Sequence, residues 1–278
     1  MKKVKHCKTA AKMFCGESDK FSGRDWVSLL VTGASLVGAL ALAGCGGGGG
    51  GADSPVNTPP AAPPGPVASV PSVGAGTWVV MGSSTAAGTG VGAGKKWSDL
   101  LQLRLADRSA KIENIAKPGA VTYQGLSTAT APVPNRPLPD PAINIDQALS
   151  RTPVVLILAY PTNDTVSGYS VDEVINNLAA IRGAALSKGI PVLVLSTQPR
   201  NVTQGQTEQL KQIDSLLASR VGGCFVNVRP LLAGPDERFM PGYDSGDGIH
   251  PNEAGHRVIA DAILATIDSG TCFKIKTT

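Results

Sequence analysis

Histidine and cysteine are scarce in this chain, which has three histidines and five cysteines among its 278 residues. No Cys-x-x-Cys pair and no Cys/His cluster with zinc spacing occurs. No Gly-x-Gly-x-x-Gly pattern of a dinucleotide-binding fold follows a predicted strand. The glycines up to Gly94-Lys95 fall short of a phosphate-binding loop, because their spacing is one residue too short and no Ser or Thr follows the lysine. Nothing in the sequence therefore predicts a metal or an organic cofactor.

Net charge is also absent once the N-terminal segment is set apart. Residues 1–44 hold seven of the 25 basic and three of the 21 acidic residues, which leaves 18 of each sign in the rest. The alkaline isoelectric point of about 8.8 thus belongs to the N-terminal segment. A neutral remainder gives no electrostatic reason to expect a nucleic-acid partner.

The N-terminal segment has the order of a bacterial export signal. Seven basic residues lie within residues 1–26, an uncharged apolar stretch follows over 27–44, and small residues end it at Ala43-Gly44-Cys45. Leu42-Ala43-Gly44-Cys45 resembles the lipobox, whose cysteine becomes the lipidated first residue of the mature protein. We therefore predict a lipoprotein signal peptide over 1–44 and lipid attachment at Cys45. A plain membrane anchor is the alternative, and Met13 is a second candidate start.

A linker is expected to join this anchor to a single domain. Six glycines at 46–51 and a Pro-rich stretch after them predict a linker over 45–76, and 77–278 is long enough for one full core. We expect a monomer, exported across the bacterial inner membrane and held by its lipid at a membrane face or the cell surface. Cys224 and Cys272 are an even pair, either a disulfide or two buried thiols.

Strands and helices are predicted to alternate along the domain. Apolar runs predict strands at Thr77–Met81 and Val154–Ala159, and further strands are predicted at Lys111–Ile115, Pro191–Ser196 and Cys224–Val228. Helical spacing predicts helices at Lys96–Arg108, Ser170–Lys188, Glu208–Arg220 and Asn252–Ile267. This order predicts an α/β fold, a three-layer α/β/α flavodoxin-like sandwich around a mostly parallel five-stranded sheet. Ligands bind such sheets at the carboxyl ends of the strands.

A histidine loop precedes the last predicted helix. His250 lies three residues after Asp247 in a Gly-rich turn, so the carboxylate can reach the imidazole and fix its tautomer. His256 falls inside the helix, where we expect a partly exposed residue without a catalytic role. Ser84 follows the first predicted strand directly, at the edge where a nucleophile needs to stand.

Two further loops complete a recognisable order. Gly119 follows the second predicted strand and Asn163 follows the third. The chain here resembles the SGNH (GDSL-like) hydrolase family, whose four blocks supply Ser, Gly, Asn and His in that order. The Asp-x-x-His-Pro signature of the last block is matched in full by Asp247, His250 and Pro251. The resemblance spans residues 77 to about 268.

The resemblance implies a serine esterase that forms an acyl-enzyme. Ser84, Asp247 and His250 would be its catalytic residues, and an oxyanion hole would come from the N–H groups of Ser84 and Gly119 with the Asn163 amide. Two positions depart from the family's common blocks: Ser83 replaces an Asp and Pro161 replaces a Gly. Pro161 removes a backbone N–H that the family can use for substrate.

Several hypotheses about function remain open from sequence alone. The favoured one is hydrolysis of short acyl or acetyl esters, including O-acetylated glycans. An O-acyltransferase using the same residues and a non-catalytic glycan-binding lipoprotein are the alternatives. Gly82-x-Ser84-x-Ala86 also approaches the nucleophile elbow of α/β-hydrolases, but an acid only three residues before the histidine argues against that fold.

Overall fold

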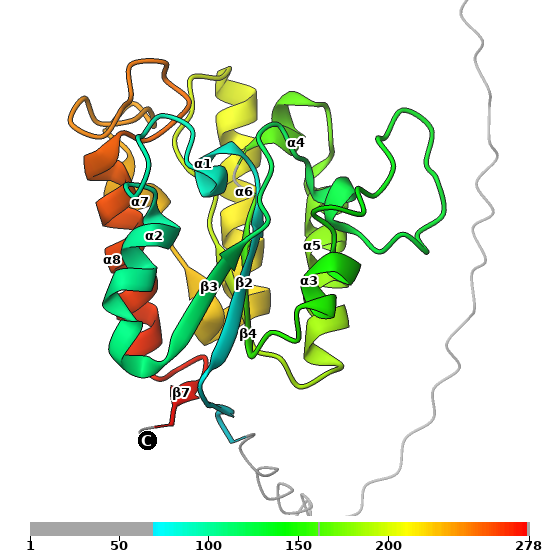
Figure 1. Cartoon of the computed structure of the whole chain (residues 1–278). Helices are drawn as coiled ribbons and strands as arrows, with labels where there is room; N and C mark the ends of the chain where they lie inside the picture. Colours follow the sequence, from blue (N-terminus) through cyan, green and yellow to red (C-terminus); the bar gives the residue numbers. More distant parts are fainter. Residues whose placement is uncertain (1–68, 161, 277–278) are drawn as a thin grey trace, which may run out of the picture. The chain divides into compact units, whose positions relative to one another are not determined.

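A computed structural model describes residues 69–160 and 162–276 of the chain (Figure 1). These residues belong to one compact unit. The predicted signal peptide, Cys45, most of the predicted linker and Pro161 lie outside them. Within the described part of the chain, no helix is long and apolar enough to cross a membrane.

A five-stranded sheet forms the centre of the unit. Its strands are β2 (Gly76–Gly82), β3 (Ala110–Asn114), β4 (Val155–Ala159), β5 (Val192–Leu195) and β6 (Phe225–Val226). They lie in the order β3-β2-β4-β5-β6, and every neighbouring pair is parallel. Numbered by chain order within this sheet, that is 2-1-3-4-5, the flavodoxin-like order. The predicted fold class is confirmed.

Helices cover both faces of this sheet (Figure 1). The helices α2 (Trp97–Arg104) and α8 (Glu253–Asp268) pack together on one face, and α3 (Ile145–Ser150), α5 (Val171–Leu186) and α6 (Gln204–Val221) lie on the other. Side chains of β2 alternate between the two cores: Trp78 and Val80 face the first, Val79 and Met81 the second. Both faces of the central strands β4 and β5 are buried, which explains their unbroken apolar runs, whereas the edge strand β3 is more exposed and carries Lys111 and Glu113.

Short elements connect these layers. They are the helices α1 (Ser84–Ala87), α4 (Asn163–Val166) and α7 (Arg229–Leu232), and the 3-10 turns η1 (Ala106–Arg108), η2 (Thr122–Gly125) and η3 (Gly222–Cys224). The sequence patterns did not predict α1, α3, α4 or α7. Three of these are only four residues long, too short for a periodic pattern to form.

Two predicted element boundaries shift for visible local reasons. Helix α6 begins at Gln204, not at Glu208, because the Thr203 hydroxyl accepts from the Gln206 N–H at 3.3 Å and the Gln206 side chain accepts from the Thr203 N–H at 3.1 Å. This capping box starts the helix. The last strand, predicted to reach Val228, covers only Phe225–Val226, since α7 follows almost at once.

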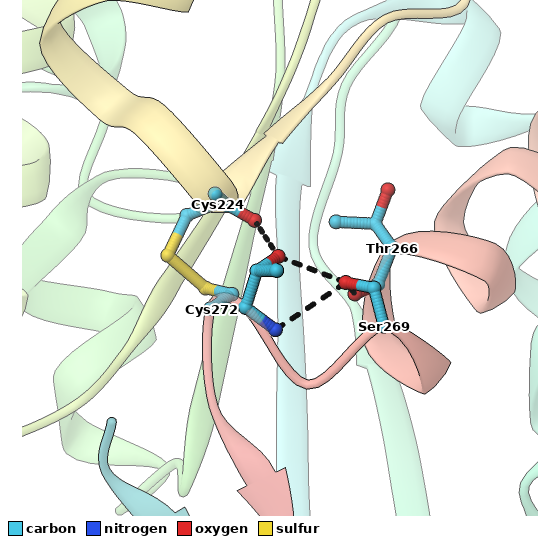
Figure 2. Close-up of a disulfide and its surroundings, with 6 residues drawn as sticks. Cys224, Thr266, Ser269 and Cys272 are labelled. Carbon is cyan, nitrogen blue, oxygen red and sulfur yellow. Dashed lines mark hydrogen bonds between the residues drawn. A yellow bond between two sulfur atoms is a disulfide. The ribbon is translucent and has the colours of Figure 1, made fainter. Parts of the chain in front are cut away.

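Both described ends of the chain meet at the edge opposite the strands' carboxyl ends. Strand β1 (Ser72–Val73) pairs with β7 (Lys274–Ile275), and Val73 is buried, so the last residues of the segment predicted as linker pack onto the domain. The sulfur atoms of Cys224 and Cys272 are bonded at 2.01 Å (Figure 2). Phe273 packs edge-on against Trp78, with ring centroids 5.5 Å apart.

Candidate active site

The carboxyl ends of β2 and β4 lie side by side at the point where the strand order reverses. Gly82 pairs with Ala159 in register, so the loops that follow leave the sheet together. A Cβ on Gly82 would collide with the Ala159 carbonyl oxygen, which explains why a glycine ends β2. Ser84 follows β2 and Asn163 follows β4, so both lie at the switch point where open α/β sheets bind ligands.

Three of the predicted site residues form a continuous hydrogen-bonded chain. The Nε2 atom of His250 lies 2.8 Å from the Ser84 Oγ atom, across 166 residues of sequence. The Nδ1 atom of the same ring lies 2.6 Å from Asp247 Oδ2. A carboxylate only accepts, so Nδ1 carries the proton and Nε2 presents its lone pair to the serine hydroxyl. This is the tautomer that a general base for Ser84 needs.

The turn around Asp247 holds its carboxylate in a fixed place. Its Oδ1 atom accepts the backbone N–H groups of Ile249 and His250, each at 2.8 Å, while Oδ2 stays on the imidazole. Burial alone would raise the pKa of the Asp247 carboxyl, but the bonds from the His250 ring and from these N–H groups outweigh it and hold that pKa below its ordinary value. Asp247 is therefore ionised at neutral pH and supports a positive imidazole.

The backbone N–H groups predicted for an oxyanion hole have no other described partner. Ser84 is the first residue of α1, and neither its N–H nor that of Gly119 donates to an acceptor among residues 69–160 and 162–276. Gly119 is exposed and has a φ of +80°, a left-handed conformation that glycine adopts without strain. Both N–H groups are thus available to a ligand.

Asn163 is held by contacts on both ends of its amide. Its Nδ2 atom donates to the Ala120 carbonyl at 3.0 Å, which ties the loop after β4 to the loop that carries Gly119. Its Oδ1 atom accepts from the Arg200 guanidinium at 2.9 Å. The structure therefore connects Asn163 to the Gly119 loop by a direct hydrogen bond, with one of its two N–H protons left over.

Asp164 reinforces the same junction, a role that the sequence did not reveal. Its buried carboxylate accepts the Thr122 N–H at 3.0 Å and also binds the Thr122 hydroxyl. Burial raises the pKa of Asp164 to about 6, although the bonds from Thr122 act in the opposite direction. The only sequence signal was its place beside Asn163 after a predicted strand.

A third loop, between β5 and α6, also went unnoticed in the sequence. Arg200 on this loop reaches Thr162 Oγ1 at 3.1 Å as well as Asn163. The Gln198 amide donates to the Ile249 carbonyl at 2.6 Å, and the Asn201 N–H donates to the Gly248 carbonyl at 2.7 Å. This loop therefore contacts both the histidine turn and the asparagine loop, and its position after a strand was the available signal.

His256 corrects a prediction. It was expected to be partly exposed, but it is completely buried on α8, and its Nδ1 atom accepts the backbone N–H of Trp97 at 3.1 Å. Burial lowers its pKa to about 4, so the ring is neutral at physiological pH. The helix pattern missed this because α2 packs on the side of α8 that carries His256.

Of the two departures from the family's common blocks, Ser83 lies among the described residues and Pro161 does not. Ser83, which stands where the family has Asp, is buried, and its hydroxyl has no partner among the described residues. Its backbone N–H donates to the Ala159 carbonyl at 3.1 Å. The prediction about a lost substrate contact at Pro161 falls outside the described residues. The Ser83 side chain thus makes no hydrogen bond to another described site residue.

Comparison with known proteins agrees with this geometry. The model of the GDSL-like Lipase/Acylhydrolase family matches residues 80–258, which include all the predicted catalytic residues. The chain belongs to this family. It is accordingly a serine ester hydrolase by family, as its sequence predicted.

Individual relatives are distant in sequence. Esterase TesA of Pseudomonas aeruginosa is 25% identical over 194 residues, which cover 69% of this chain and 87% of TesA. A crystal structure of TesA has a TM-score of 0.55 at 23% identity, covering 69% of this chain and 98% of that one. Esterase EstA from Pseudoalteromonas sp., inhibited by monoethylphosphonate, and the acetyl xylan esterase AlAXEase each have a TM-score of 0.53. They are 15% and 17% identical, covering 70% and 69% of this chain and 97% and 99% of theirs. These structures share the GDSL hydrolase's fold.

Proposed function

We propose that this GDSL hydrolase cleaves short acyl or acetyl esters, O-acetylated glycans among them, with Ser84 as nucleophile. The observation that carries this proposal is the chain from Ser84 Oγ through both His250 nitrogens to Asp247, with contacts of 2.8 and 2.6 Å. Contacts of this length are within the reach that a general base requires.

The steps follow from this geometry. Ser84 Oγ attacks the ester carbonyl carbon while His250 Nε2 takes the hydroxyl proton, and the carbonyl oxygen becomes an oxyanion near the free N–H groups of Ser84 and Gly119. Collapse expels the alcohol, which takes the proton from His250, and leaves an acyl group on Ser84. Water then attacks the acyl carbon with His250 as base, which releases the carboxylic acid and restores the serine.

The alcohol part of the substrate is proposed to be hydroxyl-rich. A cavity of about 590 Å³ lies beside the histidine turn. Its lining combines the polar Asn201, Asp236, Arg238 and Asp244 with apolar residues that include Phe239 and Met240. Amide, carboxylate and guanidinium groups suit the hydroxyls of a sugar better than they suit an acyl chain. AlAXEase, which shares this fold, is described as an acetyl xylan esterase, which supports the same substrate class.

The substrate experiment compares acyl chain length and alcohol. Hydrolysis of p-nitrophenyl esters with two to twelve acyl carbons is measured beside acetate release from acetylated xylan. We expect the highest kcat/KM on acetyl and other short esters, and acetate release from the glycan. A preference for long chains with no release from glycan would contradict the substrate assignment while leaving the esterase class intact. Transfer of acetate to an added acceptor alcohol would favour the acyltransferase.

We also propose that the protein is exported and anchored through a lipid on Cys45, and that it is a monomer. The support is the order of basic, apolar and lipobox residues before a Gly/Pro-rich stretch. Incorporation of labelled palmitate that is lost in Cys45→Ser would agree with this. Unchanged labelling of that variant would contradict it, and light scattering of the delipidated protein decides the oligomeric state.

A further inference from the structure

The amide of Asn163 has its orientation set by two partners of opposite kind. A guanidinium can only donate, and a carbonyl oxygen can only accept. Arg200 Nη1 lies 2.9 Å from Oδ1, and the Ala120 carbonyl lies 3.0 Å from Nδ2. If the amide were flipped, its N–H groups would face the Arg200 donor and its oxygen would face the Ala120 carbonyl oxygen, and both contacts would be repulsive. Arg200 thus defines which end of the amide carries its N–H groups.

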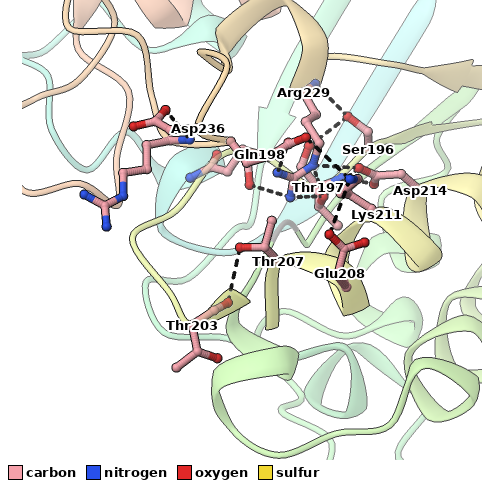
Figure 3. Close-up of polar contacts among 12 residues, drawn as sticks. Ser196, Thr197, Gln198, Thr203, Thr207, Glu208, Lys211, Asp214, Arg229 and Asp236 are labelled. Atoms are coloured by element: carbon pink, nitrogen blue, oxygen red, sulfur yellow. Dashed lines mark hydrogen bonds and ion pairs between the residues drawn. The ribbon is translucent and has the colours of Figure 1, made fainter. Parts of the chain in front are cut away.

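A buried network holds Thr197 and Gln198, which precede Arg200 on the same loop (Figure 3). The Asp214 carboxylate accepts the Thr197 N–H at 2.6 Å, and the buried Arg229 guanidinium donates to the Gln198 carbonyl at 3.0 Å. Arg229 also pairs with Asp214 at 2.9 Å. The backbone just before Arg200 is therefore held by buried partners, and the guanidinium itself is held by its bonds to Thr162 and Asn163.

The same loop is attached to the histidine turn. Gln198 holds the Ile249 carbonyl and Asn201 holds the Gly248 carbonyl, next to His250. Burial lowers the pKa of the Arg200 guanidinium, while the Asp247 charge acts to raise it, so this cation lies within electrostatic reach of the catalytic carboxylate. One loop thus spans the two halves of the site, the base on one side and the asparagine on the other.

From these contacts we infer that Arg200 is a positioning residue that orients and polarises the Asn163 amide for the oxyanion. This inference rests on the proposed function. The guanidinium draws electron density toward Oδ1, which makes the free Nδ2 proton a stronger donor. Its benefit appears when negative charge develops on the substrate oxygen, so it affects the transition state more than the bound ester.

The kinetic test is a double-mutant cycle between Arg200 and Asn163. Arg200→Ala should lower kcat about 10- to 100-fold with KM within about threefold, against the roughly 10²–10³-fold expected for Asn163→Ala, which removes the donor itself. In the Asn163→Ala background, Arg200→Ala should cost less than about threefold, since the group that it acts on is gone. Arg200→Lys, which keeps the charge, should recover part of kcat.

The control is Arg182→Gln. Arg182 is a half-buried arginine on α5, in a region lined by Ile175, Leu178 and Leu217, and burial lowers its pKa as it does that of Arg200. It should leave kcat unchanged. The inference is overturned if Arg200→Ala keeps kcat within twofold of wild type, or if its effect is equally large with and without Asn163.

A measurement independent of turnover follows the amide directly. The two Asn163 side-chain N–H signals, assigned by their loss in Asn163→Ala, should be displaced from free-amide shifts in wild type and should move toward those shifts in Arg200→Ala. Unchanged signals would overturn the inference. If Ser84→Ala kept full ester turnover, the proposed function would fail, and the amide spectrum would still decide whether Arg200 holds Asn163.

Discussion

The buried His256 makes the stability of this protein depend on pH in a calculable way. Its pKa falls from 6.5 to about 4 on folding because burial disfavours the charged ring. Between these values the unfolded chain binds a proton that the folded protein does not. The contribution is therefore fully present above pH 6.5 and is lost as the pH falls toward 4. The loss is about 2 kcal/mol at pH 5 and about 3 kcal/mol at pH 4.

The perturbation is His256→Asn. The Asn side-chain oxygen can replace Nδ1 as acceptor for the Trp97 N–H, 3.1 Å away in wild type, but it cannot titrate. At pH 8 we expect the smaller side chain to cost about 1–2 kcal/mol through the space it leaves. At pH 5 wild type has lost about 2 kcal/mol because its unfolded chain binds a proton at His256. The variant has no such group and loses nothing, so the two proteins should be nearly equal in stability.

The assay is urea unfolding of both proteins at pH 5 and pH 8 with the disulfide intact. Asp164 also titrates in this range: its folded pKa is raised to about 6, so its contribution is present at low pH and is lost as the pH rises through 6. Both proteins contain Asp164, and its effect cancels in their difference. A difference between wild type and variant that is the same at both pH values, within about 0.5 kcal/mol, would refute a neutral buried His256.

Other parts of the structure give three further predictions. Replacing both Cys224 and Cys272 by serine should lower the free energy of unfolding by up to about 4 kcal/mol, because the bond closes a loop of 48 residues. It should leave kcat within about twofold, because Cys224 lies just before β6, at the edge opposite the strand ends that carry Ser84. Thermal melts and ester turnover check both halves, and unchanged melting would speak against the bond. Asp247→Asn should lower kcat by roughly 10³–10⁴-fold with the fold intact, since an amide opposite His250 Nδ1 favours the wrong tautomer; a loss under tenfold would contradict the assigned role. Ser83→Ala should change kcat by less than about threefold and the free energy of unfolding by less than about 1 kcal/mol, because the buried hydroxyl has no described hydrogen-bond partner. A larger loss in either assay would contradict this and would mean that the hydroxyl makes a stabilising contact.

The residues that follow the strands could be predicted from sequence, because a buried strand is marked by apolar residues that are neighbours in the chain. Continuous apolar runs mark the central strands, and a parallel sheet brings whatever follows its strands to one edge. Ser84 and Asn163 could thus be placed near one another from their positions after strands, and the family resemblance added His250. The three-residue spacing from Asp247 to His250 was likewise a local feature that a single turn satisfies.

The residues that sequence reasoning missed act across loops. Arg200 bonds to Asn163 across 37 residues, and Asp164 bonds to Thr122 across 42. Such pairs depend on how the loops approach after the sheet has formed, and no periodicity encodes that approach. The burial of His256 was missed for a related reason, since it depends on α2 packing against α8 and not on the α8 pattern itself.

The most direct test of the account is covalent labelling of the intact protein by a fluorophosphonate probe, with the modified peptide identified by mass spectrometry. The account predicts one label, on Ser84, that is lost in Ser84→Ala and forms orders of magnitude more slowly in His250→Ala, because the ring 2.8 Å away no longer accepts the hydroxyl proton. A label on another serine, or equal labelling of wild type and His250→Ala, would contradict it.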